Sequence, residues 1–167
     1  MTEVTVQEGD ITKVSADALI TAINSGGMWF SGIDGAIQRC AGPMFHNQAA
    51  TANLSDGVTV FAQATQQHSG AFRNVLFVVD DLRQPLSQIV EIALKAADSA
   101  GVTSVTLPAM RTGVMAGAYE RTTQEAVAQI GIGVRNFVAG GPRSVRQITF
   151  VVYNDPSNAR TLRNTFA

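Results

Sequence analysis

The stretch ALITAINSGGMWFSGIDGAIQRCAG, Ala18 to Gly42, decides the fold. Its first six residues form a continuous apolar run, which is typical of a buried central strand. A loop rich in small residues follows, and then Ile33, Ile37 and Cys40 recur at the spacing of one helix face. A strand, a glycine loop and a helix in this order suit phosphate binding. Bare backbone N–H groups can close on the phosphate oxygens, and the helix N-terminus favours negative charge.

Further strands and helices alternate on both sides of this stretch. Strands are predicted from Val4 to a stop at Gly9 and over residues 57–64, 74–79, 102–110 and 147–153. Helical periodicity covers the residues between Pro85 and Gly101, residues 127–137, and a segment that starts at Asp155–Pro156. The alternation predicts an α/β fold, a three-layer α/β/α sandwich with a mixed, mostly parallel central sheet. We expect one domain over residues 1–167.

Composition narrows the classes of function. Hydrophobic residues make up 46% of the 167 and charged residues 15%, so the chain is not disordered. A formal net charge of −1 provides no basic field and argues against nucleic acid as a partner. One cysteine, Cys40, excludes an internal disulfide and a multi-cysteine metal site, and it fits the core better than a nucleophile. The acidic, polar N-terminus and the lack of a long apolar run predict a soluble, cytoplasmic protein with no membrane partner. No metal, no cofactor and no oligomeric state are predicted.

Chemistry is expected where the parallel strands end, in the loops after residues 23, 110 and 153. The loop RTGVMAGAYE, Arg111 to Glu120, again leads from small residues into a helix, so two clamps on one diphosphate are expected. Asp10, in GDIT, could accept a hydrogen bond from the exocyclic amine of an adenine, or simply form an Asx turn. His46 and His68 have no partner at ligand spacing, and both are interpreted as structural or exposed.

Four motifs together resemble the macrodomain family, whose members bind ADP-ribose. In chain order they are GDIT, ADALITAIN, GIDGAIQRCAG and LPAMRTGV, and the resemblance runs from Gly9 to about Asn158. It implies that Asp10 accepts a hydrogen bond from the adenine amine, with the backbone of Ile11 beside it. It implies that Asn24 contacts the distal ribose and that Asp34 takes part in hydrolysis, as in one active branch of the family. Asn24 could instead serve only a turn, and Asp34 could serve as an ordinary helix N-cap.

The resemblance also assigns the remaining ligand contacts. It places the second phosphate loop at Thr112, Gly113, Val114 and Met115. It implies that Tyr153 lies against the adenine, with Asn154 next to it. The first loop is assigned to the ligand as well, through residues Trp29, Phe30, Ser31, Gly32 and Ile33.

The chain departs from the family pattern at several of these places. Trp29 and Phe30 stand where the family usually has glycines, and we expect at least one of the two rings to line the cleft. The alternative is that both rings anchor the loop from beneath. Gln38 stands where a histidine is common, and Met115 stands where an aromatic commonly covers the phosphates.

Function is predicted at two levels. The chain is expected to bind ADP-ribose or an ADP-ribosylated protein. As a hydrolase it would release ADP-ribose from mono-ADP-ribosyl esters on acidic side chains or from related derivatives, with Asn24 and Asp34 as catalytic residues. The alternative is a non-catalytic ADP-ribose reader or sponge, for which the altered glycine run is the main argument. A nucleic-acid-binding module is the weakest of the three hypotheses.

Overall fold

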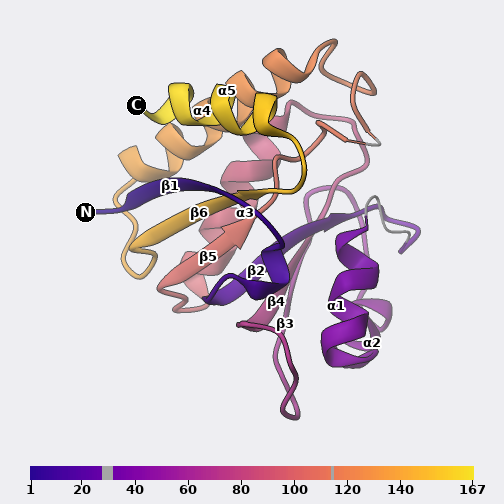
Figure 1. Ribbon diagram of the computed structural model, residues 1–167. Coiled ribbons are helices and arrows are strands. Elements are labelled where there is room, and N and C mark those ends of the chain that lie inside the picture. Colours follow the sequence, from indigo (N-terminus) through magenta and orange to yellow (C-terminus); the bar gives the residue numbers. More distant parts are fainter. Residues whose placement is uncertain (28–31, 114) are drawn as a thin grey trace.

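The computed structural model describes residues 1–27, 32–113 and 115–167. A six-stranded sheet runs through the middle of the molecule in the order β1-β6-β5-β2-β4-β3 (Figure 1). The strands are β1 (Glu3–Glu8), β2 (Ala16–Ile23), β3 (Thr59–Ala62), β4 (Phe72–Val79), β5 (Ser104–Leu107) and β6 (Gln147–Val152). Each of the six predicted strands is present.

Five of the strands are parallel, and this places their carboxyl ends on one edge of the sheet. The central strand β2 pairs in parallel with β4 on one side and with β5 on the other, so that Leu19 lies opposite both Val75 and Thr106. β6 pairs in parallel with β5 and with β1. Only β3, at the edge, is antiparallel, to β4. The prediction of a mixed, mostly parallel sheet is confirmed.

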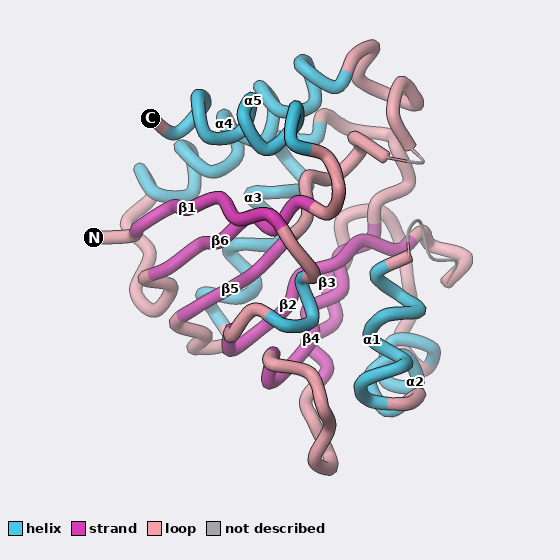
Figure 2. The backbone as a smooth tube through the Cα atoms, viewed as in Figure 1, coloured by secondary structure: helices cyan, strands magenta, loops and turns pink. Residues whose placement is uncertain are grey.

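Helices cover both faces of the sheet, as Figures 1 and 2 show. Their bounds are α1 (Ile33–Ala41), α2 (Met44–Ala50), α3 (Leu86–Ser99), α4 (Thr123–Ala139) and α5 (Pro156–Phe166), with a short 3-10 helix η1 (Ile11–Lys13) after β1. Alternation along β2 divides the core in two. Ala18 and Ile20 pack with α3, α4 and α5, whereas Leu19 and Ile23 pack with α1 and α2. The three-layer sandwich is therefore confirmed.

Two local expectations need correction. Helix α2 was not predicted, because seven residues show too little of a period, and its buried Phe45 and Ala49 are its clearest signal. Asp34 is not the N-cap of α1: Gly32 occupies that position and Asp34 lies in the first turn.

Cys40 packs against the smaller core cluster, as expected of a core residue. Within the described ranges, no helix is both long and apolar enough to cross a membrane.

Candidate functional site

A cleft of about 550 Å³ lies at the carboxyl ends of the strands. Its walls come from the turn after β1, from β2, from α1 and from the segments that follow β4, β5 and β6. This volume lies within the range of small-molecule sites. The described lining residues on which the site depends are Asp10, Ile11, Gly32, Ile33, Arg39, Asp80, Arg111, Thr112, Gly113, Met115 and Tyr153.

Asp10 lines the cleft and also caps η1. Its Oδ1 accepts hydrogen bonds from the Thr12 backbone N–H (2.9 Å) and from Thr12 Oγ1 (2.7 Å). The Asx-turn alternative is thus real, and both bonds fall on one of the two carboxylate oxygens. These hydrogen bonds hold the pKa of Asp10 below its ordinary value of 3.8, with smaller help from the charges of Lys13 and Arg39. The carboxylate is therefore ionised at neutral pH and can accept from an amine. Ile11, which is buried, lines the cleft beside it.

Helix α1 begins at the cleft wall. Gly32, its N-cap, and Ile33, its first residue, both line the cleft. The first-turn N–H groups of a helix have no partner within the helix, so this end favours an anion. Arg39 reaches the same cleft from the last turn of α1, and its side chain passes over Gly35. The first predicted clamp thus faces the cleft through Gly32 and Ile33.

The second predicted loop forms another part of the wall. Thr112, Gly113 and Met115 line the cleft, and Thr112 Oγ1 donates to the carbonyl of Ala109 at 2.6 Å. The backbone enters the loop through Arg111, a non-glycine residue with a left-handed φ of 60°. The structure therefore brings both predicted phosphate loops to one cleft.

Tyr153 and Asn154 follow β6. Tyr153 lines the cleft and is 78% exposed, so its ring is available as a flat surface for a planar group. Asn154 has a left-handed φ of 52°, and it is not among the described residues that line the cleft. Only the first of the two therefore faces the ligand space directly.

The two predicted catalytic residues, Asn24 and Asp34, are likewise not among the described residues that line the cleft. The Asn24 carbonyl accepts the Gly27 N–H at 3.0 Å, so Asn24 does take part in a turn. Oδ1 of Asp34 contacts Nε2 of His46, which is buried on α2. Sequence reasoning missed this pair, because nothing in the pattern joins positions 34 and 46.

Burial controls the ionisation of His46. It lowers the pKa of this imidazole below the ordinary 6.5, although the neighbouring charge of Asp34 acts in the opposite direction. The ring also packs edge-on against Phe77, with 5.3 Å between the ring centroids. A neutral imidazole can still donate its Nε2–H to a carboxylate. The second histidine, His68, packs against Phe45 and Phe72, as expected of a structural residue.

Four of the assigned residues, Trp29, Phe30, Ser31 and Val114, lie outside the described residues. The expectation that Trp29 or Phe30 lines the cleft therefore stays a prediction.

Sequence reasoning also missed four charged residues that line the cleft, Arg39, Asp80, Arg111 and Asp155. Two of them carried a usable signal: Asp80 directly follows a predicted strand, and Arg111 lies inside the LPAMRTGV motif. In the part of the chain that the structure describes, no group of three or more His, Cys, Asp or Glu side chains could hold a metal ion.

Comparisons with known proteins agree with this architecture. The sequence model of the Macro domain matches residues 20–126. A Macro domain-containing protein of Streptomyces coelicolor is 32% identical over 165 residues, which cover 92% of this chain and 93% of that protein. An O-acetyl-ADP-ribose deacetylase of Citrobacter rodentium is 30% identical over 160 residues, which cover 90% of this chain and 88% of the relative.

Solved structures show the same fold. The Trypanosoma brucei macrodomain in complex with ADP-ribose aligns with a TM-score of 0.81 at 22% identity, over 98% of this chain and 69% of its own. An Oceanobacillus iheyensis macrodomain with ADP aligns with a TM-score of 0.74 at 20% identity, over 96% of this chain and 88% of its own. With the matched Macro domain model and the sequence relatives, this likeness identifies the chain as a member of the macro domain family.

Proposed function

We propose that this protein binds ADP-ribose in the cleft at the carboxyl ends of β2, β5 and β6. The observation that carries the proposal is the convergence of an ionised Asp10, the N-terminus of α1 and the loop after β5 on one space of about 550 Å³. An acceptor for an amine and two groups of backbone N–H donors for phosphates are what an adenine nucleotide diphosphate requires. Relatives named for ADP-ribose chemistry, and a similar structure in complex with ADP-ribose, support the same ligand.

The ligand would lie along the cleft in a fixed direction. Its adenine would donate to Asp10 and lie against the ring of Tyr153. Its diphosphate would lie between the N-terminus of α1 and the Thr112–Gly113 segment, and its distal ribose would point toward Asn24. Both strand-end loops would then contribute backbone N–H groups to one diphosphate.

We propose in addition that the bound derivative is hydrolysed. Asn24 would hold the distal ribose, and a water activated by Asp34 or by the substrate's own phosphate would attack the anomeric carbon. The new bond joins the water oxygen to that carbon, the bond from the carbon to the ester oxygen breaks, and the water's proton leaves to the base. The products are ADP-ribose and a free carboxylate, and positioning would supply most of the rate. Relatives named as a deacetylase and as an ADP-ribose glycohydrolase support a hydrolytic role.

A non-catalytic reader is the second candidate, and one observation favours it. Asp34 is turned toward His46, and neither Asp34 nor Asn24 is among the described residues lining the cleft. A reader needs only the binding surface, which does not depend on this carboxylate.

Two measurements test these proposals in turn. Calorimetry with free ADP-ribose tests binding, and the absence of binding by the folded protein would reject both candidates. Release of ADP-ribose from a protein modified on Asp or Glu side chains then separates the hydrolase from the reader. If the protein is a hydrolase, Asn24→Ala and Asp34→Ala should abolish release while reducing affinity much less. Binding without any release by the wild type would establish the reader.

A further inference from the structure

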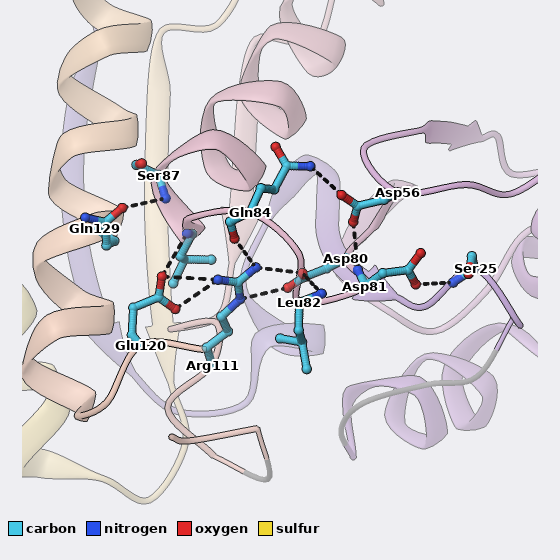
Figure 3. Close-up of polar contacts among 11 residues, drawn as sticks. Ser25, Asp56, Asp80, Asp81, Leu82, Gln84, Ser87, Arg111, Glu120 and Gln129 are labelled. Atoms are coloured by element: carbon cyan, nitrogen blue, oxygen red, sulfur yellow. Dashed lines mark hydrogen bonds and ion pairs between the residues drawn. The ribbon is translucent and has the colours of Figure 1, made fainter. Parts of the chain in front are cut away.

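Arg111 lines the cleft, and its side chain lies in a cluster of buried charges (Figure 3). Its side chain is 2% exposed and forms ion pairs with Asp80, at the end of β4, and with Glu120, nine residues further along its own loop. An arginine in a phosphate-binding loop would ordinarily be expected to contact the phosphate. The geometry of this arginine excludes that role.

All three nitrogens of the guanidinium already donate to acceptors within the protein. Nε and Nη2 donate to the two oxygens of Asp80, at 3.1 and 2.7 Å. Nη1 donates to both oxygens of Glu120, at 2.9 and 3.2 Å, and Nη2 donates to the carbonyl of Gln84 at 3.0 Å. All three nitrogens are thus held by protein acceptors, and the side chain is 2% exposed. The guanidinium is therefore held by the protein rather than offered to a ligand.

The cluster closes the second loop at its base. Arg111 and Glu120 are the first and last residues of the segment 111–120, and they bind each other directly, so the two ends of this segment are joined. Glu120 Oε2 also accepts the backbone N–H of Leu86 at 3.0 Å, which connects the loop to the start of α3. Arg111 holds its left-handed backbone at the same point, φ 60°. The conformation of the segment that includes Thr112 and Gly113 is therefore set by protein contacts.

The segment after β4 also connects this cluster to the other cleft loop. Asp81, next to Asp80, accepts the backbone N–H of Ser25 at 2.8 Å, in the loop that follows β2. Asp56 accepts the backbone N–H of Asp81 at 2.8 Å and the side-chain amide of Gln84 at 2.7 Å. Figure 3 shows these contacts as one continuous network. Ser25, after β2, and Arg111, after β5, are thus hydrogen-bonded to the same short segment, residues 80–84.

We propose that Arg111 is a positioning residue that holds the loop after β5 ready for a diphosphate without touching the ligand. The inference rests on the proposed function for the identity of the ligand. It makes the contribution of Arg111 one of preorganisation, because a loop that is ordered before binding loses less conformational freedom when the ligand arrives. We expect the effect on the diphosphate and not on the adenine, which the proposed function places against Asp10 and Tyr153.

The test replaces Arg111 by lysine, which keeps the charge but cannot bridge two carboxylates and a carbonyl with a planar fork. In Arg111→Lys we expect affinity for ADP-ribose and ADP to fall by about tenfold or more, and affinity for adenosine to stay within about twofold of wild type. Calorimetry measures the first two ligands and an NMR titration measures adenosine. Amide hydrogen exchange of residues 112–119 in the free protein should become faster. Arg121→Lys is the matched control, because Arg121 is an exposed arginine next to the same loop, and it should leave all four measurements unchanged.

Glu120→Gln provides a second variant in case Arg111→Lys does not fold. It keeps an acceptor oxygen for the guanidinium and for the Leu86 N–H but removes the charge, so a smaller loss with the same pattern across the three ligands is expected. A folded variant with wild-type ADP-ribose affinity and wild-type exchange overturns the inference, and so does an equal loss for adenosine. A loss of ADP-ribose affinity with unchanged hydrogen exchange of the loop would indicate direct contact with the phosphates and would also overturn it. Failure of the wild type to bind ADP-ribose would reject the proposed function and not the role of Arg111. That role is tested separately by amide hydrogen exchange in the free protein, and unchanged exchange in Arg111→Lys would reject it.

Discussion

Asp10 uses one carboxylate oxygen for the fold and leaves the other for a ligand. Both bonds from Thr12 end on Oδ1, so we expect Oδ2 to accept the adenine amine. Asp10→Asn keeps the acceptor for Thr12 and places an NH₂ group where Oδ2 was. This NH₂ group and the adenine amine are both hydrogen-bond donors, so they cannot bond to each other. ADP-ribose affinity should fall by roughly 1–3 kcal/mol, as for a lost charge-assisted hydrogen bond, with little change in stability. Calorimetry on the folded variant measures this.

Asp17 provides a matched control for that substitution. Its Oδ2 accepts the backbone N–H and the hydroxyl of Thr103, which is the same pattern. Asp17, however, is the second residue of strand β2, at the amino end of that strand and away from the cleft. Asp17→Asn should leave ADP-ribose affinity unchanged. Equal affinity for Asp10→Asn and wild type would remove Asp10 from the adenine site.

His46 makes stability depend on pH in a defined window. Because burial lowers its pKa in the folded state below the ordinary 6.5, the unfolded chain takes up a proton first as the pH falls. The free energy of unfolding should therefore be independent of this group above about pH 6.5 and should decrease as the pH falls below it. Urea unfolding between pH 7.5 and about pH 5 measures this before carboxylates with an ordinary pKa of 3.8 titrate.

Because the chain has only two histidines, replacing each in turn identifies which of them causes the pH dependence of stability. His46→Gln should flatten the profile between about pH 6.5 and pH 5, whereas His68→Gln should retain it. A steep profile that persists in His46→Gln would mean that the folded state does not suppress protonation of His46.

At the scale of elements, close packing of two helices explains Gly133 in α4, a position where glycine is unfavourable for helix formation. A Cβ at this position would lie 2.6 Å from the carbonyl oxygen of Ser87 and 3.0 Å from Cβ of Val90, both on α3. Gly133→Ala gains about 1 kcal/mol of helix propensity but forces two helices apart, which costs about 1–3 kcal/mol. We expect a net loss of up to roughly 2 kcal/mol in chemical unfolding.

Gly131, two residues earlier on the same helix, is the matched control. The nearest atom to a Cβ there would be the terminal methyl of Thr165, a side chain near the end of α5, and then the guanidinium of Arg135. Side-chain ends can move, so Gly131→Ala should be clearly less destabilising than Gly133→Ala. An equal effect of the two substitutions would contradict close backbone contact as the reason for Gly133.

The elements themselves were largely predictable from sequence, because each is defined by a local period or a local stop. The alternation of apolar runs with helical segments was enough for the strands, and Asp155 caps α5 through the Asn158 N–H as its position before Pro156 predicts. What could not be predicted depends on contacts between distant positions. The pairing of Asp34 with His46 and the cluster of Asp80, Arg111 and Glu120 join residues on different elements, and no spacing within one segment reports them. The residues of the candidate site were assigned from the family resemblance, whereas their contacts are known only from the three-dimensional structure.

At the scale of the whole molecule, the cleft joins parts of the chain that lie far apart in sequence. It takes residues from the turn after β1, from α1 and from the loops after β5 and β6, while two core clusters hold opposite faces of one sheet. Among the described charged residues that line it, Asp10, Asp80 and Asp155 face Arg39 and Arg111, so there is no surplus of positive charge. Binding of a diphosphate here must depend on backbone N–H groups more than on net attraction.

This arrangement predicts a large and salt-tolerant stabilisation by ligand. A ligand at 100 times its Kd that binds only the folded state adds about 2.7 kcal/mol, and for a chain of this size each kcal/mol raises Tm by about 2–4 °C. ADP-ribose at that concentration should therefore raise Tm by roughly 5–10 °C. The shift should persist at high salt, whereas a nucleic-acid-binding protein would lose most of its affinity because phosphate contacts release counterions. Scanning calorimetry at low and high salt, with ADP-ribose or an adenine-rich RNA, makes the comparison. A shift with RNA alone that disappears at high salt would contradict ADP-ribose binding and favour the nucleic-acid hypothesis.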